Sequence, residues 1–131
     1  MKDRKFERLC ANKLYDNSYW ALNIPKNSAG AQPFDLIAMK DTKICAYDCK
    51  VISSNIASFP FSRIEYNQRS SFEEITLKVI TEEVGLLIYF MEEIYFVSWD
   101  KIKNLEARGE KSIKLRKELL WLKQDDGNCF R

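Results

Sequence analysis

Hydrophobic and polar positions alternate along the chain with two periods, which predict helices and strands in a mixed order. Residues 3–15 and 61–79 place apolar side chains at helical spacing. Runs rich in strong β formers predict strands at 19–24, 34–39, 43–53, 84–91 and 94–98. Two shorter helices are expected at 100–105 and 115–122. The predicted order is helix, three strands, helix, two strands and helices, which is a mixed α/β fold.

Local signals predict where several of these elements begin and end. Ser62 is followed three residues later by Glu65, which is the spacing of a capping box. The second long helix should therefore begin at Ser62 and run to residue 82 or 83. Turn residues at 40–42 and 92–93 predict two hairpins, each joining the strands on either side.

The predicted strand 43–53 carries two opposite charges on an otherwise apolar face. Because side chains alternate along a strand, one face holds Ile44, Ala46, Asp48, Lys50 and Ile52, and the other holds Cys45, Tyr47, Cys49 and Val51. A charge on a buried face is costly unless it is paired or binds a metal. Asp48 and Lys50 are therefore candidates for chemistry, although a solvent-facing strand could carry the same pattern by chance.

Asp35 adds a second carboxylate to this candidate site. If strand 34–39 pairs with strand 43–53 through the turn at 40–42, Asp35 lies near Asp48. Two carboxylates with nearby backbone carbonyls suit Mg²⁺ or Mn²⁺. Such an ion would polarise a phosphate and lower the pKa of a bound water, while Lys50 would orient that water or steady negative charge. The chemistry indicated is phosphodiester hydrolysis.

Composition limits the other possibilities. With 131 residues, of which 46% are hydrophobic and 31% charged, the chain fits one domain over 1–131, with a core at about 3–105 and a helical extension at about 106–131. The absence of histidine excludes Ser-His-Asp and Cys-His catalysis and His-ligated zinc. No apolar run approaches the roughly 20 residues of a membrane span, and the first residues carry charges throughout, so we expect a cytoplasmic protein.

Charge and cysteine content each leave two interpretations open. The net charge of +2 divides into +3 for residues 1–60, −5 for 61–100 and +4 for 101–131. The two basic ends would form a nucleic-acid-binding patch if they meet in space, or they are ordinary solvated helix faces. The four cysteines are interpreted as buried reduced thiols, with redox or metal use as the alternative.

Several short motifs occur in one order along residues 2–105 and beyond. They are Phe6-Glu7-Arg8, then Pro25 with Ser28 and Gly30, Pro33-Phe34-Asp35, Asp48-Cys49-Lys50, Gln68, and Lys111-Ser112-Ile113. This series resembles the PD-(D/E)XK nuclease superfamily, and within it the Holliday-junction resolvases of archaeal type and of the bacterial RecU type. Asn23 departs from the pattern, because archaeal-type enzymes usually carry an arginine there.

The resemblance implies a restriction-endonuclease-like αβββαβ core with flanking helices. It also implies a metal-dependent endonuclease, usually a homodimer, that nicks paired strands of a four-way DNA junction. Two alternatives stay open. The same chemistry could act on DNA ends, flaps or duplex, or the chain could be a catalytically silent nuclease-like module that only binds DNA or a protein.

The resemblance also implies a role for each matching residue. Asp35 and Asp48 would bind Mg²⁺ or Mn²⁺, with the backbone carbonyl of Cys49 as a further ligand, and Lys50 would assist the nucleophile. The supporting residues would be Glu7 from the first helix, Ser28 in a loop near the phosphate, and Gln68 through a hydrogen bond toward the site.

Overall fold

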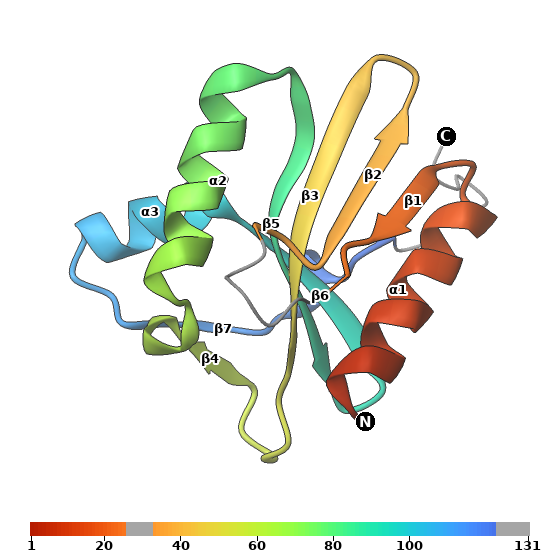
Figure 1. The fold of residues 1–131 in the computed structure, drawn as a ribbon. Helices are drawn as coiled ribbons and strands as arrows, with labels where there is room; N and C mark the ends of the chain where they lie inside the picture. The colour runs from red at the N-terminus through yellow and green to blue at the C-terminus, as the bar shows by residue number, and fades with distance from the viewer. Residues whose placement is uncertain (26–32, 123–131) are drawn as a thin grey trace.

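The computed structural model describes residues 1–25 and 33–122, which fold around a five-stranded mixed sheet (Figure 1). Across the sheet the strands follow the order β1 (Trp20–Asn23), β2 (Leu36–Lys40), β3 (Lys43–Val51), β5 (Thr81–Phe90) and β6 (Glu93–Ser98). Strands β3 and β5 are parallel, and the other neighbouring pairs are antiparallel. The expected strands are all present, and both hairpins form. The first turn lies within the predicted 40–42, and the second lies at residues 91–92, one residue earlier than predicted, because Glu93 already pairs with Phe90.

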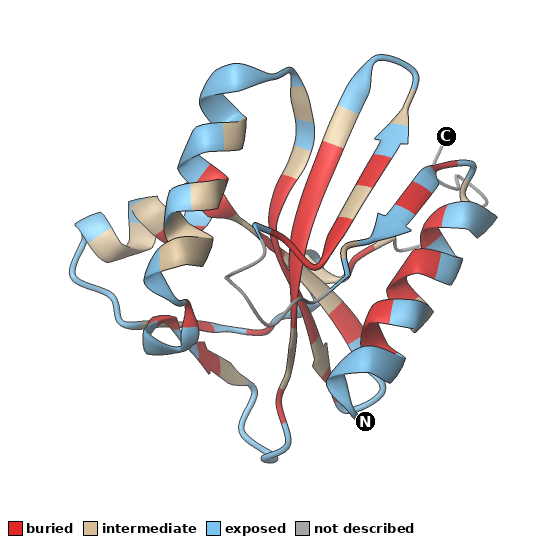
Figure 2. Ribbon diagram, in the orientation of Figure 1, coloured by how far each residue is buried: buried red, intermediate tan, exposed pale blue. Residues whose placement is uncertain are grey.

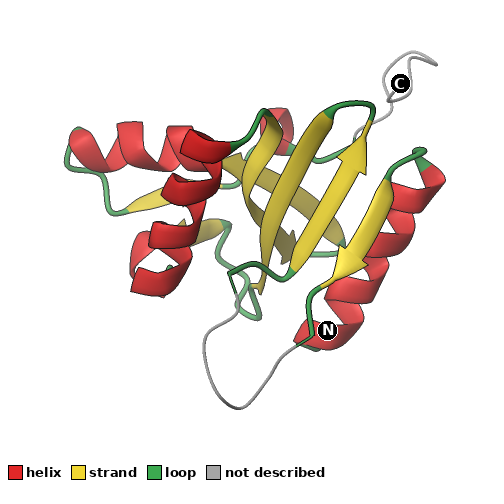
Figure 3. Ribbon diagram, turned by 45° about the horizontal axis from the view of Figure 1, so that its top comes forward, coloured by secondary structure: helices red, strands yellow, loops and turns green. Residues whose placement is uncertain are grey.

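Helices cover both faces of this sheet (Figures 1 and 3). Helix α1 (Asp3–Asp16) packs on one face, and α2 (Tyr66–Lys78) and α3 (Trp99–Ala107) lie on the other. A second sheet of two short strands, β4 (Ser58–Pro60) and β7 (Ser112–Lys114), lies beside the N-terminal end of α2. The 3-10 turns η1 (Phe61–Arg63) and η2 (Lys117–Leu119) complete the described elements.

The apolar side chains gather into two clusters, one on each face of the sheet. Strand β3 contributes to both, as its alternating pattern predicted. Ala46 packs in the cluster under α2 and α3, whereas Cys45, Tyr47 and Cys49 pack in the cluster under α1. Strands β3 and β5 are buried in the middle of the sheet, which Figure 2 shows as continuous red segments. This central position is what buries the polar residues of β3.

The predicted boundaries of the second helix are wrong at both ends. Ile64 has extended backbone dihedrals and a buried side chain, so the α-helix begins only after it, at Tyr66. The capping box is formed by Glu65 and Gln68 instead of Ser62 and Glu65. The helix ends at Lys78, and Thr81 already belongs to β5, where it pairs with Ile44.

The predicted helix at 115–122 is also wrong. Backbone hydrogen bonds tie this segment to distant parts of the chain, with Leu115 N donating to Ala57 O at 3.0 Å and Trp121 N to Ile94 O at 2.9 Å. These bonds replace the local ladder that a helix would need. Helix α3 runs longer than expected and is capped by Ser98, whose side chain accepts from Lys101 N, instead of by Asp100.

The cysteine prediction holds for the part of the chain that the structure describes. Cys10, Cys45 and Cys49 are buried free thiols, and Cys129 lies outside the described residues. No helix in residues 1–25 or 33–122 has the length and apolar character to cross a membrane.

Candidate active site

The hairpin of β2 and β3 brings Asp35 and Asp48 together. Leu36 pairs with Tyr47, so Asp35, one residue earlier, lies opposite Asp48. Two hydrogen bonds hold this arrangement: Asp35 N donates to Tyr47 O at 2.9 Å, and Cys49 N donates to Asp35 Oδ2 at 2.8 Å. The strand pairing expected from the turn at 40–42 therefore positions both carboxylates.

Asp48 stands out among the polar residues of the described chain because it is buried and one of its oxygens lacks a hydrogen-bond partner. The residue is 1% exposed, and its Oδ2 accepts no hydrogen bond from any described residue. Burial raises the pKa of Asp48 to about 7, and the negative charge of Asp35 adds to this shift. The Lys50 charge and the Asp35 peptide N–H lower the pKa but do not offset the rise. A buried carboxylate beside a like charge favours either a proton or a cation.

Lys50 shares the face of Asp48 and is held by the start of α2. Its Nζ donates to Gln68 Oε1 at 3.1 Å. Gln68 Oε1 also accepts from Glu65 N at 3.0 Å as part of the capping box. The N-terminal turn of α2 therefore fixes the ammonium beside the carboxylates. Since a side chain used as a helix cap cannot swing freely, Lys50 is constrained in position.

Glu65 is a site residue that the sequence interpretation missed. Its charge also contributes to the raised pKa of Asp48, as the smallest of the five influences. The signal was present as Glu65 followed three residues later by Gln68, but glutamate is not among the preferred N-cap residues.

Glu7 approaches this region from the opposite face of the sheet. It is 4% exposed on α1 and lies near Cys49, whose side chain belongs to the α1 cluster. Burial, a hydrogen bond with Cys10 and the charges of Asp35 and Glu7 all raise the pKa of the Cys49 thiol. Ser28, the other expected site residue, lies outside the described residues.

The carboxylate pair could hold a divalent cation. Mg²⁺ is commonly bound by one or two protein carboxylates, with water and substrate phosphate filling the other positions. The unpartnered Oδ2 of Asp48 beside Asp35 fits that pattern. Within residues 1–25 and 33–122, no three Asp, Glu, Cys or His side chains gather into a metal-holding group.

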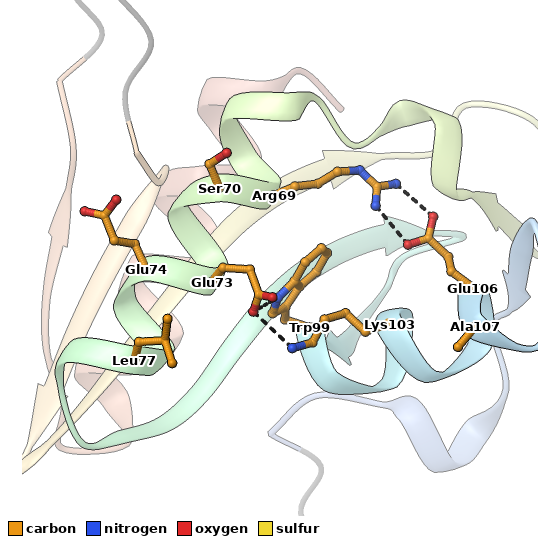
Figure 4. Close-up of a pocket in the computed structure, with 9 residues that line it drawn as sticks. All are labelled: Arg69, Ser70, Glu73, Glu74, Leu77, Trp99, Lys103, Glu106 and Ala107. Atoms are coloured by element: carbon orange, nitrogen blue, oxygen red, sulfur yellow. Dashed lines mark hydrogen bonds and ion pairs between the residues drawn. The ribbon is translucent and has the colours of Figure 1, made fainter.

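A separate hollow of about 770 Å³ between α2 and α3 has a different character (Figure 4). Four of its five charged side chains bind one another, and the fifth, Glu74, pairs with Lys78 at 3.2 Å. Arg69 forms two hydrogen bonds with the Glu106 carboxylate, at 2.8 and 3.0 Å. Glu73 Oε2 accepts from Trp99 Nε1 and from Lys103 Nζ, each at 3.0 Å. These bonds fasten α3 to α2, and they leave the hollow without the unsatisfied chemistry found at Asp48.

Comparison with known proteins addresses the fold. No protein-family model and no curated protein matches the chain. Among solved structures, it is similar to Archaeoglobus fulgidus Hjc, a Holliday junction resolvase from an archaeal hyperthermophile. The TM-score is 0.59 at 16% identity, over 88% of this chain and 89% of that chain. The fold is restriction-endonuclease-like. This fold is the one that the family resemblance implied, and in it Asp35, Asp48, Lys50 and Gln68 meet at one place.

Proposed function

We propose that the protein is a metal-dependent, structure-selective DNA endonuclease that resolves four-way junctions by hydrolysing phosphodiester bonds. The observation that carries the proposal is the buried, unpartnered Oδ2 of Asp48 beside Asp35 and Lys50. The likeness to the Hjc resolvase supports a nuclease fold and makes a DNA junction the first substrate to test.

In this proposal Asp35 and Asp48 hold Mg²⁺ or Mn²⁺, and the Cys49 carbonyl is a further ligand. When bound, such an ion polarises the scissile phosphate and lowers the pKa of a coordinated water. Asp48 must lose its proton to act as a ligand, and its pKa of about 7 means that this happens near neutral pH. The Cys49 N–H keeps the Asp35 carboxylate turned toward strand β3 during binding.

Lys50 acts on the reacting groups through its ammonium. Held by Gln68, it orients the attacking water or stabilises the negative charge that develops on the phosphate oxygens. Gln68 is a positioning residue, since it fixes Lys50 while capping α2. Glu7 adds negative charge from the α1 face, and Ser28 is proposed to lie near the phosphate.

Two symmetric cuts in one junction require two active sites related by a two-fold axis, so the proposal includes a homodimer. Light scattering at micromolar concentration should give twice the 15.4 kDa mass of the chain. A monomer under these conditions would contradict the dimer.

Cleavage of defined DNA substrates tests the function directly. A labelled immobile four-way junction and a matched linear duplex are incubated with the protein in Mg²⁺ or in EDTA. Wild type is compared with Asp48→Ala and with Asp16→Ala, which removes an exposed carboxylate at the end of α1. We expect Mg²⁺-dependent paired nicks confined to the junction, abolished in Asp48→Ala and retained in Asp16→Ala.

The other outcomes identify the alternatives. Equal cleavage of the junction and the duplex would replace the resolvase with a nuclease of broader substrate range. Binding in EDTA without any Mg²⁺-dependent nicking would favour a silent nuclease-like module.

A further inference from the structure

A groove of about 440 Å³ between α3 and β7 lies outside the candidate active site. Lys101 lines it from α3, and Lys114 and Arg116 line it from β7 and the segment that follows. None of these three cations forms an ion pair with a described residue. Glu110 and Glu118 also line the groove, so it keeps an excess of positive charge.

The backbone directs two of these cations to the same side. Ile113 and Leu115 are buried, each 7% exposed, so the alternation of an extended chain turns Lys114 and Arg116 outward together. Residues two apart on such a chain are separated by about 7 Å. Ser112, which also lines the groove, precedes Lys114 by the same interval. The result is a short row of donors along one edge of the groove.

Arg63 connects this row with the candidate active site. Its Nη1 donates at 3.2 Å to the carbonyl oxygen of Val51, the residue that directly follows Lys50 on the chain. Its guanidinium lies 5.4 Å from the centroid of the Phe59 ring, and Phe59 pairs with Ile113 of β7. This exposed cation therefore contacts both the strand that carries Lys50 and the strand that pairs with β7.

The distance between the groove and the candidate active site suits a single nucleic-acid ligand. Lys114 pairs with Ser58, and Gln68, the partner of Lys50, is ten residues further along. A fully extended chain of that length spans about 35 Å, and η1 and the first turn of α2 shorten this path. The span is therefore within about one turn of B-DNA, which is roughly 34 Å. One DNA arm can therefore reach both.

The charge of the region favours a polyanion over a protein partner of mixed charge. Residues 101–122 contain seven Lys and Arg and three Asp and Glu. Glu106 is already paired with Arg69 on α2. The remaining cations of residues 101–122 therefore outnumber the carboxylates that could neutralise them. The preceding segment, residues 61–100, has the opposite net charge, −5. Phosphates spaced along a strand match a row of exposed cations.

We infer that Lys101, Lys114 and Arg116 form a basic ledge that binds backbone phosphates of a DNA arm leading away from the cut. This inference rests on the proposed function, because it assumes that DNA is the ligand of the candidate active site. The ledge contributes affinity and orientation, and it takes no part in the chemistry at Asp48 and Lys50.

Salt-dependent binding of the full chain tests the ledge. A fluorescent four-way junction is titrated by anisotropy in EDTA, which prevents cleavage, at about 50 to 200 mM salt. The variant is Lys114→Gln with Arg116→Gln, and the matched control is Lys13→Gln with Lys78→Gln, two exposed cations on α1 and α2. All four substitutions are at exposed positions, and thermal melting confirms that both proteins fold.

The logarithm of the DNA-binding constant falls linearly with the logarithm of the salt concentration. Loss of two phosphate contacts should make this slope shallower by about 1.8. We also expect the ledge variant to bind at least tenfold more weakly than wild type at the lowest salt. A tenfold change in affinity corresponds to about 1.4 kcal/mol of binding free energy. The control should keep both the wild-type slope and the wild-type cleavage rate.

The two possible failures are distinguishable. If wild type binds and cuts DNA but the ledge variant matches the control in slope and affinity, the ledge is wrong and the proposed function stands. If wild type does not bind DNA at all, both the ledge and the proposed function are wrong.

Discussion

Two pairs of acidic residues lie on or beside the central strands β3 and β5, namely Asp35 with Asp48 and Glu82 with Glu83, and they differ in how their oxygens are satisfied. Asp35 and Asp48 form one pair, in which Asp48 Oδ2 has no hydrogen-bond partner among the described residues. In the other pair, Glu83 Oε1 accepts from Tyr47 OH at 2.5 Å and from Trp121 Nε1 at 3.2 Å. Burial raises the pKa of both Asp48 and Glu83, so burial alone does not separate them.

The second pair depends on an irregularity of the sheet. Ile44 pairs with Thr81, but Cys45 pairs with Glu83, so Glu82 is an extra residue in β5. Such a bulge re-aims side chains. It lets Glu82 Oε1 accept from Tyr19 OH at 2.7 Å, while the neighbouring Glu83 bonds Tyr47.

The difference separates a structural network from the candidate active site. The Glu83 network joins β3, β5 and the C-terminal segment through completed hydrogen bonds, which stabilise the fold. Asp48 Oδ2 lacks such a partner, and the charge of this carboxylate favours a proton or a cation. A buried carboxylate oxygen without a donor is costly to the fold, and Asp48 is therefore the better candidate for binding a ligand.

The largest expected effect comes from neutralising Asp48. Asp48→Asn should lower Mg²⁺-dependent cleavage by about 1,000-fold or more, because metal-centred charge stabilisation contributes several kcal/mol. The melting temperature at pH 8 should not fall, since the variant removes a buried charge. Cleavage kinetics and thermal melting measure the two effects.

Glu83→Gln is the matched control for this substitution, since it neutralises the satisfied carboxylate and keeps an acceptor oxygen. Cleavage by Glu83→Gln should stay within a few-fold of wild type. A loss of cleavage equal to that of Asp48→Asn would remove the distinction between the two pairs.

The next effect is a dependence of stability on pH. Between pH 4 and 7 folded Asp48 keeps its proton, because its pKa is raised from 3.8 to about 7, while the unfolded carboxyl loses it. Unfolding therefore releases a proton, and the free energy of unfolding should fall by up to about 4 kcal/mol as pH rises through this range. Denaturant unfolding at pH 5 and pH 8 measures this change.

Comparison with Asp48→Asn isolates the contribution of Asp48, because the raised pKa of Glu83 gives a slope of the same sign. The variant should lose most of the decrease. If wild type and Asp48→Asn show the same change between pH 5 and pH 8, the raised pKa of Asp48 is wrong. Mg²⁺ should stabilise wild type at pH 8 more than at pH 5, since only the deprotonated carboxylate binds it.

The smallest expected effect is at the satisfied pair. Glu83→Ala should lower the free energy of unfolding by about 1–3 kcal/mol, because Tyr47 OH and Trp121 Nε1 lose their acceptor. Glu82→Ala should cost less, since Glu82 is exposed and water can replace it. Urea unfolding measures both. A larger loss in Glu82→Ala than in Glu83→Ala would show that the bulge, and not the buried network, holds this end of the sheet.

The sequence by itself determined the parts of the molecule that depend on local pattern. Period-two alternation in 43–53 placed Asp48 and Lys50 on one face, and the turn at 40–42 placed Asp35 opposite Asp48. The first statement holds because side chains alternate along any strand. The second holds because a hairpin closes over few residues, so its register follows from the turn. The order of helices and strands, and with it the fold class, followed from the same kind of pattern.

Only the tertiary structure decided the features that depend on distant partners. Burial of Ile64 delayed the start of α2 and made Glu65 and Gln68 its cap, which in turn holds Lys50. Backbone hydrogen bonds from Leu115 N to Ala57 O and from Trp121 N to Ile94 O replaced the helix that local spacing favoured at 115–122. The orphaned Asp48 Oδ2 belongs here too, because whether a buried oxygen has a partner depends on every segment packed around it, and no local pattern records that.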